Sequence, residues 1–128
     1  MRVLIVEDDE IFCQFLTEIL ESKEIEVVRT TDGLAGYEKA WAFPYDLYIL
    51  DVRMPGWLGS EIAEALKQKN PGAKIILISA FADEALRQTA ANIGAPLLSK
   101  PFSADELFQT IDKAKSPPKA STQKISRT

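Results

Sequence analysis

The chain has 128 residues, 46% hydrophobic and 27% charged, which suits one globular domain with a single core and excludes a second domain. Its net charge is −4, and because residues 116–128 contain three basic residues and no acid, the first 115 residues stand at −7. This charge argues against direct binding of nucleic acid by the globular part.

The N-terminus, the hydropathy and the cysteine content bear on where the protein is located. The first ten residues are too acidic, and their apolar run too short, for a signal peptide, and no segment has the roughly 18 apolar residues of a membrane span. The single cysteine, Cys13, excludes an internal disulfide and fits a reducing environment. We therefore expect a cytoplasmic protein that does not contact a membrane.

The chain begins with alternating strand and helix patterns. The run Val3–Val6 is apolar at every position, which is typical of a strand covered on both faces. Apolar residues spaced by about 3.6 then predict a helix. Its expected inward face is Ile11, Phe12, Phe15, Leu16, Ile19 and Leu20. A weaker run, Val27–Val28, precedes a second helix with Asp32 as its expected N-cap. The expected inward face of that helix is Leu34, Tyr37 and Trp41.

The middle of the chain repeats this alternation around a carboxylate. The apolar run Leu47–Leu50 ends on Asp51, and Pro55-Gly56 then turns the chain. A third helix begins near Gly59 and must end by Asn70-Pro71, because the residue before proline is disfavoured in helical conformation. The residues expected to pack inward from this helix are Ile62, Ala63 and Leu66.

The last third adds two more strand and helix pairs. The run Ile75–Ile78 precedes a helix over about 83–93, and Gly94 is its natural left-handed C-cap. The short run Leu97–Leu98 precedes a fifth helix, whose opening sequence Ser103–Glu106 matches a capping box. Five such pairs in strict alternation predict an α/β fold, a doubly wound (βα)5 domain with right-handed crossovers around a five-stranded parallel sheet.

Polar residues follow the predicted strands at their carboxyl ends, where doubly wound sheets bind ligands. Glu7 and Asp8 follow the first strand, Asp51 the third, Ser79 the fourth and Lys100 the fifth. Carboxylates within about 4 Å of one another repel by several kcal/mol even at an effective dielectric of ~20, so a cation or a proton must relieve the cluster. Because the donor set is all oxygen, without His or Cys, it favours Mg²⁺ or Mn²⁺ over zinc.

These residue types suit the transfer of a phosphoryl group to a carboxylate. Asp51 is the carboxylate best placed to attack phosphorus, Lys100 is a point-charge partner for phosphate, and Ser79 can donate a hydrogen bond. Metal, lysine and hydroxyl would together stabilise charge on the equatorial oxygens of an in-line transfer. The pattern therefore indicates phosphorylation of an aspartate.

Four motifs, in this order on the predicted strands, resemble those of the receiver domain of two-component response regulators: VLIVEDD, ILDVRMPG, ILISA and LLSKPF. The resemblance covers residues 1 to about 115 and implies the flavodoxin-like strand order 2-1-3-4-5. It implies that Asp51 is the phosphoacceptor and that Asp8 and Asp51 bind Mg²⁺ directly. Glu7 would act on the metal through water, and Arg53 would supply its backbone carbonyl oxygen.

The resemblance also assigns the other strand ends. Ser79 stands at the position of the switch hydroxyl and Lys100 at that of the family's lysine, with a cis Lys100-Pro101 peptide bond. Two features depart from the family's pattern. Leu97 stands where many receivers carry a Tyr or Phe that moves inward on phosphorylation. The acidic run also contains one carboxylate too many, which by its place is Asp9, and we assign Asp9 to helix capping.

The leading hypothesis is a phosphoryl-accepting signalling switch that takes its phosphoryl group from a histidine kinase or phosphotransfer protein. By the resemblance, the surface of the fourth helix, fifth strand and fifth helix then contacts a downstream output domain or protein. Such a domain is not an enzyme in its own right, although it assists its own phosphorylation and dephosphorylation. We expect a monomer or a weak phosphorylation-dependent dimer.

Two alternatives belong to other classes. A Mg²⁺-dependent phosphohydrolase of haloacid-dehalogenase type also uses a strand-end aspartate, but it needs a second aspartate two residues on, where this chain has Arg53. A receiver-like scaffold that acts without phosphorylation is compatible with Leu97 and is opposed by intact Asp51, Asp8 and Lys100.

Residues 116–128, with two prolines and mostly polar side chains, predict a flexible tail or linker, so the receiver is expected to stand alone or to be part of a longer regulator. Trp57, six residues beyond Asp51, is expected to report on the site.

Overall fold

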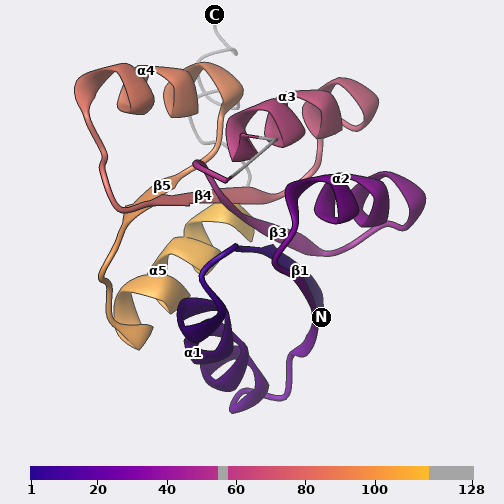
Figure 1. Ribbon diagram of the computed structural model, residues 1–128, viewed down its shortest axis with the longest axis vertical. Coiled ribbons are helices and arrows are strands. Elements are labelled where there is room, and N and C mark those ends of the chain that lie inside the picture. Colours follow the sequence, from indigo (N-terminus) through magenta and orange to yellow (C-terminus); the bar gives the residue numbers. More distant parts are fainter. Residues whose placement is uncertain (55–57, 116–128) are drawn as a thin grey trace, which may run out of the picture.

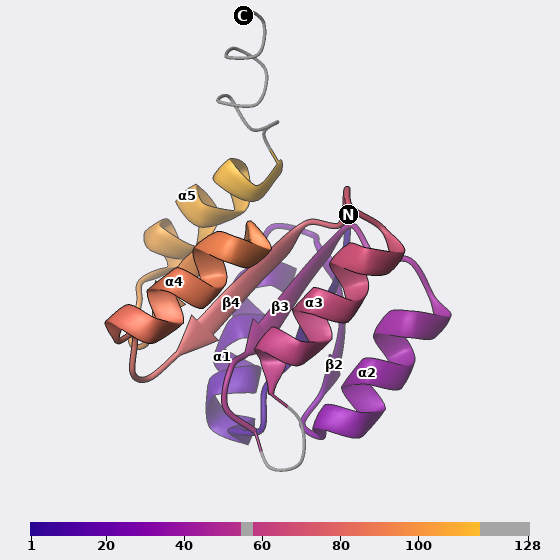
Figure 2. The same ribbon diagram turned by 90° about the horizontal axis from the view of Figure 1, so that it is seen from above.

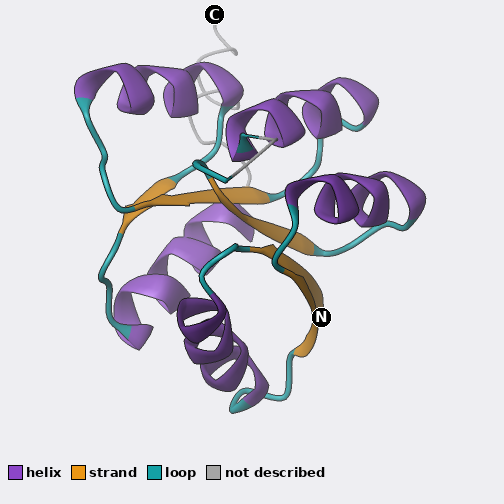
Figure 3. Ribbon diagram, viewed as in Figure 1, coloured by secondary structure: helices purple, strands orange, loops and turns teal. Residues whose placement is uncertain are grey.

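The computed structural model describes residues 1–54 and 58–115 (Figure 1). The predicted Pro55-Gly56 turn, Trp57 and the predicted tail or linker over 116–128 lie outside the described residues. The elements alternate as expected (Figure 3). They are β1 (Arg2–Val6), α1 (Glu10–Glu21), β2 (Glu26–Thr30), α2 (Gly33–Ala42), β3 (Leu47–Asp51), α3 (Gly59–Lys69), β4 (Ile75–Ser79), α4 (Glu84–Ile93), β5 (Leu97–Ser99) and α5 (Ala104–Lys115).

The strands form one parallel sheet in the order β2-β1-β3-β4-β5, which confirms the predicted fold and strand order. Helices α2, α3 and α4 cover one face and α1 and α5 the other, as Figures 1 and 2 show. Val6 pairs with Leu50, and Asp51 pairs with Ile78. The carboxyl ends of the three central strands therefore meet at one edge of the sheet.

The central strands have the burial that their sequences predict. Every residue of β3 and β4 is buried, as are Val3–Val6 of β1, because helices cover the sheet on both sides. The edge strands β2 and β5 are only partly buried. None of the helices in the described parts of the chain is long and apolar enough to cross a membrane.

The helix ends carry the expected caps. Asp32 accepts a hydrogen bond from the backbone N–H of Ala35 at 2.9 Å, and Gly94 ends α4 with a left-handed φ of 82°. Ser103 and Glu106 form the predicted capping box, with reciprocal backbone-to-side-chain hydrogen bonds of 2.8 and 3.1 Å. Side-chain hydrogen bonds therefore set the starts of α2 and α5, and a left-handed glycine ends α4.

The prediction for the inward face of α2 is right only for Tyr37, which is half-buried and packs against the core. Leu34 and Trp41 are 47% and 43% exposed, whereas the buried residues of the helix are Gly33, Gly36 and Ala40. A Cβ on Gly36 would lie 2.6 Å from a methyl carbon of Val6, so the helix lies against β1 through its smallest residues. The larger side chains are left at the flanks of the contact.

The prediction for α1 is right only in part. Leu16 and Leu20 are buried as expected, but Ile11 is 84% exposed and Phe15 38% exposed. Cys13 is buried in the face that packs on the sheet. The apolar stripe of α1 is thus wider than the surface that the sheet and α5 cover.

Candidate functional site

Asp51 is the last residue of β3, and its side chain lies at the carboxyl edge of the sheet with only 5% of the residue exposed. The backbone N–H of Arg53 donates to its Oδ1 at 3.2 Å. The chain then returns to the strand end, because Arg53 bridges to Leu58 and the N–H of Gly59 donates to the Val52 carbonyl at 3.0 Å. The start of α3 therefore fixes the backbone beneath Asp51.

Three carboxylates meet at this edge. Each of Glu7, Asp8 and Asp51 offers an oxygen within 4.8 Å of the others. Glu7 is fully buried and Asp8 is exposed, so the cluster reaches from the protein interior to the solvent. Asp9 is not one of its members: its Oδ1 accepts hydrogen bonds from the N–H groups of Ile11 and Phe12 at 3.0 and 3.1 Å, which caps α1 as predicted.

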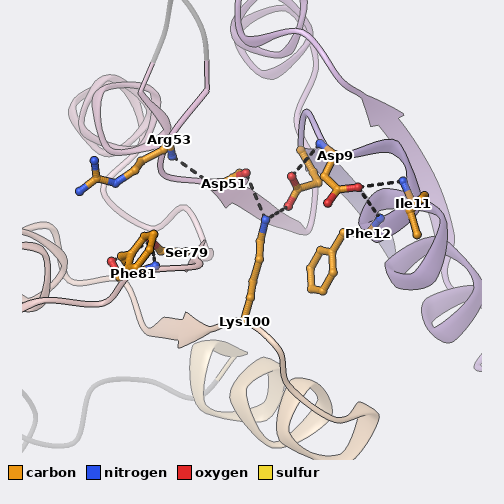
Figure 4. A network of polar contacts seen from close by, with 9 residues as sticks. Asp9, Ile11, Phe12, Asp51, Arg53, Ser79, Phe81 and Lys100 are labelled. Carbon is orange, nitrogen blue, oxygen red and sulfur yellow. Dashed lines mark hydrogen bonds and ion pairs between the residues drawn. The ribbon is translucent and has the colours of Figure 1, made fainter.

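Lys100 places its ammonium among the buried acids (Figure 4). Its Nζ lies 2.7 Å from Glu7 Oε1 and 3.3 Å from Asp51 Oδ2. Its backbone N–H donates to the Ser79 carbonyl at 2.8 Å, which ties the end of β5 to the end of β4. The Lys100-Pro101 peptide bond is cis, as the resemblance implied.

Burial and charge change the acidity of the cluster. Burial raises the pKa of Glu7 to about 7, and the neighbouring Asp51 adds to the shift, against the opposing effect of Lys100 and the Asp9 N–H. Burial alone would lower the pKa of Lys100, but its contacts with Glu7 and Asp51 outweigh burial and raise it. The ammonium therefore stays charged, and burial increases the affinity of the Glu7 carboxyl for a proton.

Ser79 makes different contacts. It is buried at the end of β4, where its Oγ donates to the Phe81 carbonyl at 2.9 Å and accepts from the Phe81 N–H at 3.0 Å. The hydroxyl therefore bonds the backbone two residues further on, and Figure 4 shows it pointing to Phe81 rather than to Lys100. Leu97 is half-buried and packs against the core on the α4 side.

The structure therefore brings Glu7, Asp8, Asp51 and Lys100 together, with the backbone of Arg53 beside them. Sequence reasoning missed Phe12, whose ring lies beneath the Lys100 ammonium at 4.7 Å from its centroid. It also missed how close the start of α3 comes: a Cβ on Gly59 would lie 2.1 Å from the Asp51 carbonyl oxygen. For Phe12, the available signal was an aromatic residue in the first turn of the first helix. For Gly59, it was a glycine at the start of a helix.

The cluster fits a hard divalent cation. Its donors are carboxylate oxygens only, from one exposed and two buried residues, and they converge on one point without a His or Cys. Mg²⁺ is bound in proteins by one or two carboxylates together with waters and phosphate oxygens. The residues present at this edge therefore meet the chemical needs of that ion.

The family model described as the response regulator receiver domain matches residues 3–112. The chain belongs to this family. Receiver domains of response regulators act as phosphorylation-based signalling switches, so this is the class of function of the chain. The receiver protein CpdR of Brucella abortus is 34% identical over 88% of this chain and 94% of its own length.

Longer relatives match only in part. The response regulator ArlR of Staphylococcus epidermidis is 36% identical, and the transcriptional regulatory protein CusR of Escherichia coli 35% identical. The chain spans about half the length of these two relatives, 50% and 49%. What ArlR and CusR do beyond this half is therefore not carried over to this receiver.

Solved structures agree with the fold. A CheY-like receiver domain from Methanospirillum hungatei aligns with a TM-score of 0.82 at 27% identity, over 88% of this chain and 90% of that one. The response regulator TrrA of Thermotoga maritima, solved with Mg²⁺ and BeF, aligns with a TM-score of 0.79 at 32% identity over 88% and 97%. The receiver fold is thus shared over nearly the whole of the described chain.

Proposed function

We propose that Asp51 is the phosphoacceptor of this receiver and takes its phosphoryl group from a phosphohistidine on a histidine kinase or phosphotransfer protein. The observation that carries the proposal is the placement of Asp51: a buried carboxylate at the end of a central strand, with two further acids within 4.8 Å and an ammonium at 3.3 Å. If Asp51 served only as a turn residue or a helix cap, neither the neighbouring carboxylates nor Lys100 would be needed beside it.

The residues suit an in-line displacement. An oxygen of Asp51 attacks phosphorus, so that a P–O bond forms while the P–N bond to the donor histidine breaks and its electron pair returns to the imidazole. The Arg53 N–H holds Oδ1, which leaves Oδ2 on the side of Lys100. The ammonium, 3.3 Å from Oδ2, is then within reach of an oxygen of the new phosphoryl group.

We further propose that the reaction depends on Mg²⁺, with Mn²⁺ as a substitute. Asp8 and Asp51 would hold the ion directly, the Arg53 carbonyl would add an oxygen, and Glu7 would act through water. When bound, the ion neutralises charge that develops on the phosphoryl oxygens. TrrA, which was solved with Mg²⁺ and BeF, supports this part of the proposal by similarity.

The consequence of phosphorylation would be a shift of the surface of α4, β5 and α5, which a downstream domain or protein contacts. For this shift the Ser79 hydroxyl must leave Phe81, to which it is bonded at 2.9 Å. Leu97, half-buried beside α4, lacks the ring of the usual partner of this hydroxyl. We propose that the domain has no substrate other than its own acyl phosphate, since Arg53 occupies the position of the second aspartate of a phosphohydrolase.

The test uses acetyl phosphate and Mg²⁺ as a small phosphodonor. Intact mass should show one added phosphoryl group on the wild type that is acid-stable and hydroxylamine-labile, and none on Asp51→Asn, which keeps the size of the side chain. Asp9→Asn is the matched control, because an asparagine still caps α1. An undiminished adduct on Asp51→Asn, or none on the wild type, would contradict the proposal, and turnover of phosphomonoesters would favour a phosphohydrolase.

A further inference from the structure

Lys100 and three residues near the start of α1 form a closed ring of contacts (Figure 4). The N–H of Asp9 donates to Glu7 Oε2 at 3.0 Å, and the N–H of Phe12 donates to Asp9 Oδ1 at 3.1 Å. The Phe12 ring lies 4.7 Å from Lys100 Nζ, and Nζ lies 2.7 Å from Glu7 Oε1. The α1 cap at Asp9, the Glu7 carboxylate and the Lys100 ammonium therefore belong to one contact network that includes the Phe12 ring.

The Phe12 ring itself is held in place. It meets the Phe102 ring edge to face, with centroids 5.3 Å apart and an interplanar angle of 87°. Phe102 is buried in the α1 and α5 side of the core, two residues beyond Lys100. Phe12 is half-buried, and its own place in the first turn of α1 is set by the Asp9 cap. The ring is thus a fixed surface rather than a mobile exposed side chain.

A ring in this position acts on the ammonium in two ways. Its negative face attracts the cation, and it packs against the same ammonium that contacts Glu7 and Asp51. An ammonium on a flexible four-carbon stem would otherwise sample many positions. Its contacts with the Phe12 ring, Glu7 and Asp51 restrict the positions that the Lys100 ammonium can take.

We propose that Phe12 is a positioning residue for phosphoryl transfer to Asp51, which acts by holding the Lys100 ammonium at the level of the acceptor carboxylate. The inference rests on the proposed function and deepens it. It also gives Asp9 a second role, since the cap that Asp9 provides sets the place of the ring. The contact that Phe12 makes at the site is with Lys100, so its proposed action is through the ammonium.

The experiment compares Phe12→Leu, Phe12→Tyr and Phe15→Leu with the wild type. Leucine keeps an apolar side chain but removes the ring, whereas tyrosine keeps the ring. Phe15 is the matched control, because it lies on the same helix with its ring 5.4 Å from that of Phe12 and belongs to no contact with Lys100. The rate of phosphorylation by acetyl phosphate with Mg²⁺ should fall by about tenfold in Phe12→Leu. It should stay close to the wild-type rate in Phe12→Tyr and Phe15→Leu.

A second readout does not need phosphorylation. The ε-methylene protons of Lys100, assigned by their loss in Lys100→Met, should carry an upfield ring-current shift that Phe12→Leu removes and Phe12→Tyr keeps. Unshifted protons in the wild type, equal rates in wild type and Phe12→Leu, or an equal loss in Phe12→Leu and Phe12→Tyr would overturn the inference. A wild type that accepts no phosphoryl group would instead overturn the proposed function, and the positioning role with it.

Discussion

At the scale of single residues, the site is an excess of buried negative charge. Glu7 and Asp51 lie in the interior with one ammonium between them, and Asp8 adds a third carboxylate at the surface. One lysine cannot balance them, and proton binding at Glu7 offsets part of the excess, because burial first and Asp51 second raise the pKa of Glu7 to about 7. A divalent cation at this edge would supply positive charge that the cluster lacks.

This balance predicts how the stability of the metal-free protein depends on pH. The pKa of Glu7 rises from 4.5 to about 7 on folding, so within that range the folded state holds a proton that the unfolded chain has lost. The free energy of unfolding should therefore fall as pH rises through this window, because the folded state binds more protons than the unfolded state. Glu7→Gln, which keeps an acceptor for Lys100 without the charge, should remove this fall.

Urea unfolding in EDTA at a series of pH values measures the difference. Above pH 7, Glu7→Gln should be more stable than the wild type by up to about 3 kcal/mol, at about 1.4 kcal/mol for each unit of pKa shift. Glu64→Gln, which removes an exposed acid of α3, is the control and should follow the wild type. Parallel curves for wild type and Glu7→Gln would show that the carboxyl is not held protonated.

At the scale of elements, two glycines set the distances between helices and strands. Gly36 brings α2 against β1, and Gly59 brings the start of α3 against the end of β3. The second contact matters more for the site, because the atom that a Cβ on Gly59 would meet is the backbone oxygen of Asp51, at 2.1 Å. A backbone atom cannot turn aside as the end of a side chain can.

Gly59→Ala should therefore move the phosphoacceptor as well as destabilise the fold. Overpacking of this kind typically costs about 1–3 kcal/mol, so the free energy of unfolding should fall by that amount, and phosphorylation by acetyl phosphate should slow. Gly72→Ala is the matched control: its Cβ would meet only Asn70 Oδ1 at 3.5 Å, an ordinary contact. Equal stability of the two variants would mean that the α3 start can shift without strain.

The elements also mark how far sequence reasoning reaches. Strand positions were predictable because the runs Val3–Val6, Leu47–Leu50 and Ile75–Ile78 are apolar at every position. The starts of α1, α2 and α5 were predictable because local side chains cap them. The residues by which α2 packs on the sheet were not predictable from the helix alone, because the approach of Gly36 to Val6 depends on a strand distant in sequence. The contact between Phe12 and Lys100 was not predictable either, because an aromatic in the first turn of α1 does not show that its partner lies 88 positions further along the chain.

At the scale of the whole molecule, the site unites distant parts of the chain. Glu7 and Asp8 follow the first strand, Asp51 ends the third and Lys100 follows the last, and only the parallel sheet brings these strand ends together. The unfolded chain has no such cluster. Any ligand of the site therefore binds the folded state alone and stabilises the entire domain by mass action, by about 2.7 kcal/mol at a concentration 100 times its Kd.

Mg²⁺ should thus raise the unfolding temperature of the whole domain in a concentration-dependent way, and the variant that tests the ligand assignment is Asp8→Asn. Asp8 is exposed, so its loss leaves the core intact while removing one of the three carboxylates. Asp9→Asn removes the adjacent charge but keeps the α1 cap, so it separates a specific ligand from a general effect of negative charge. Thermal unfolding with and without Mg²⁺ at constant ionic strength should show the stabilisation in the wild type and in Asp9→Asn, and little of it in Asp8→Asn. The same loss in both variants would mean that Mg²⁺ responds to the charge of the acidic run and not to a site built from Glu7, Asp8 and Asp51.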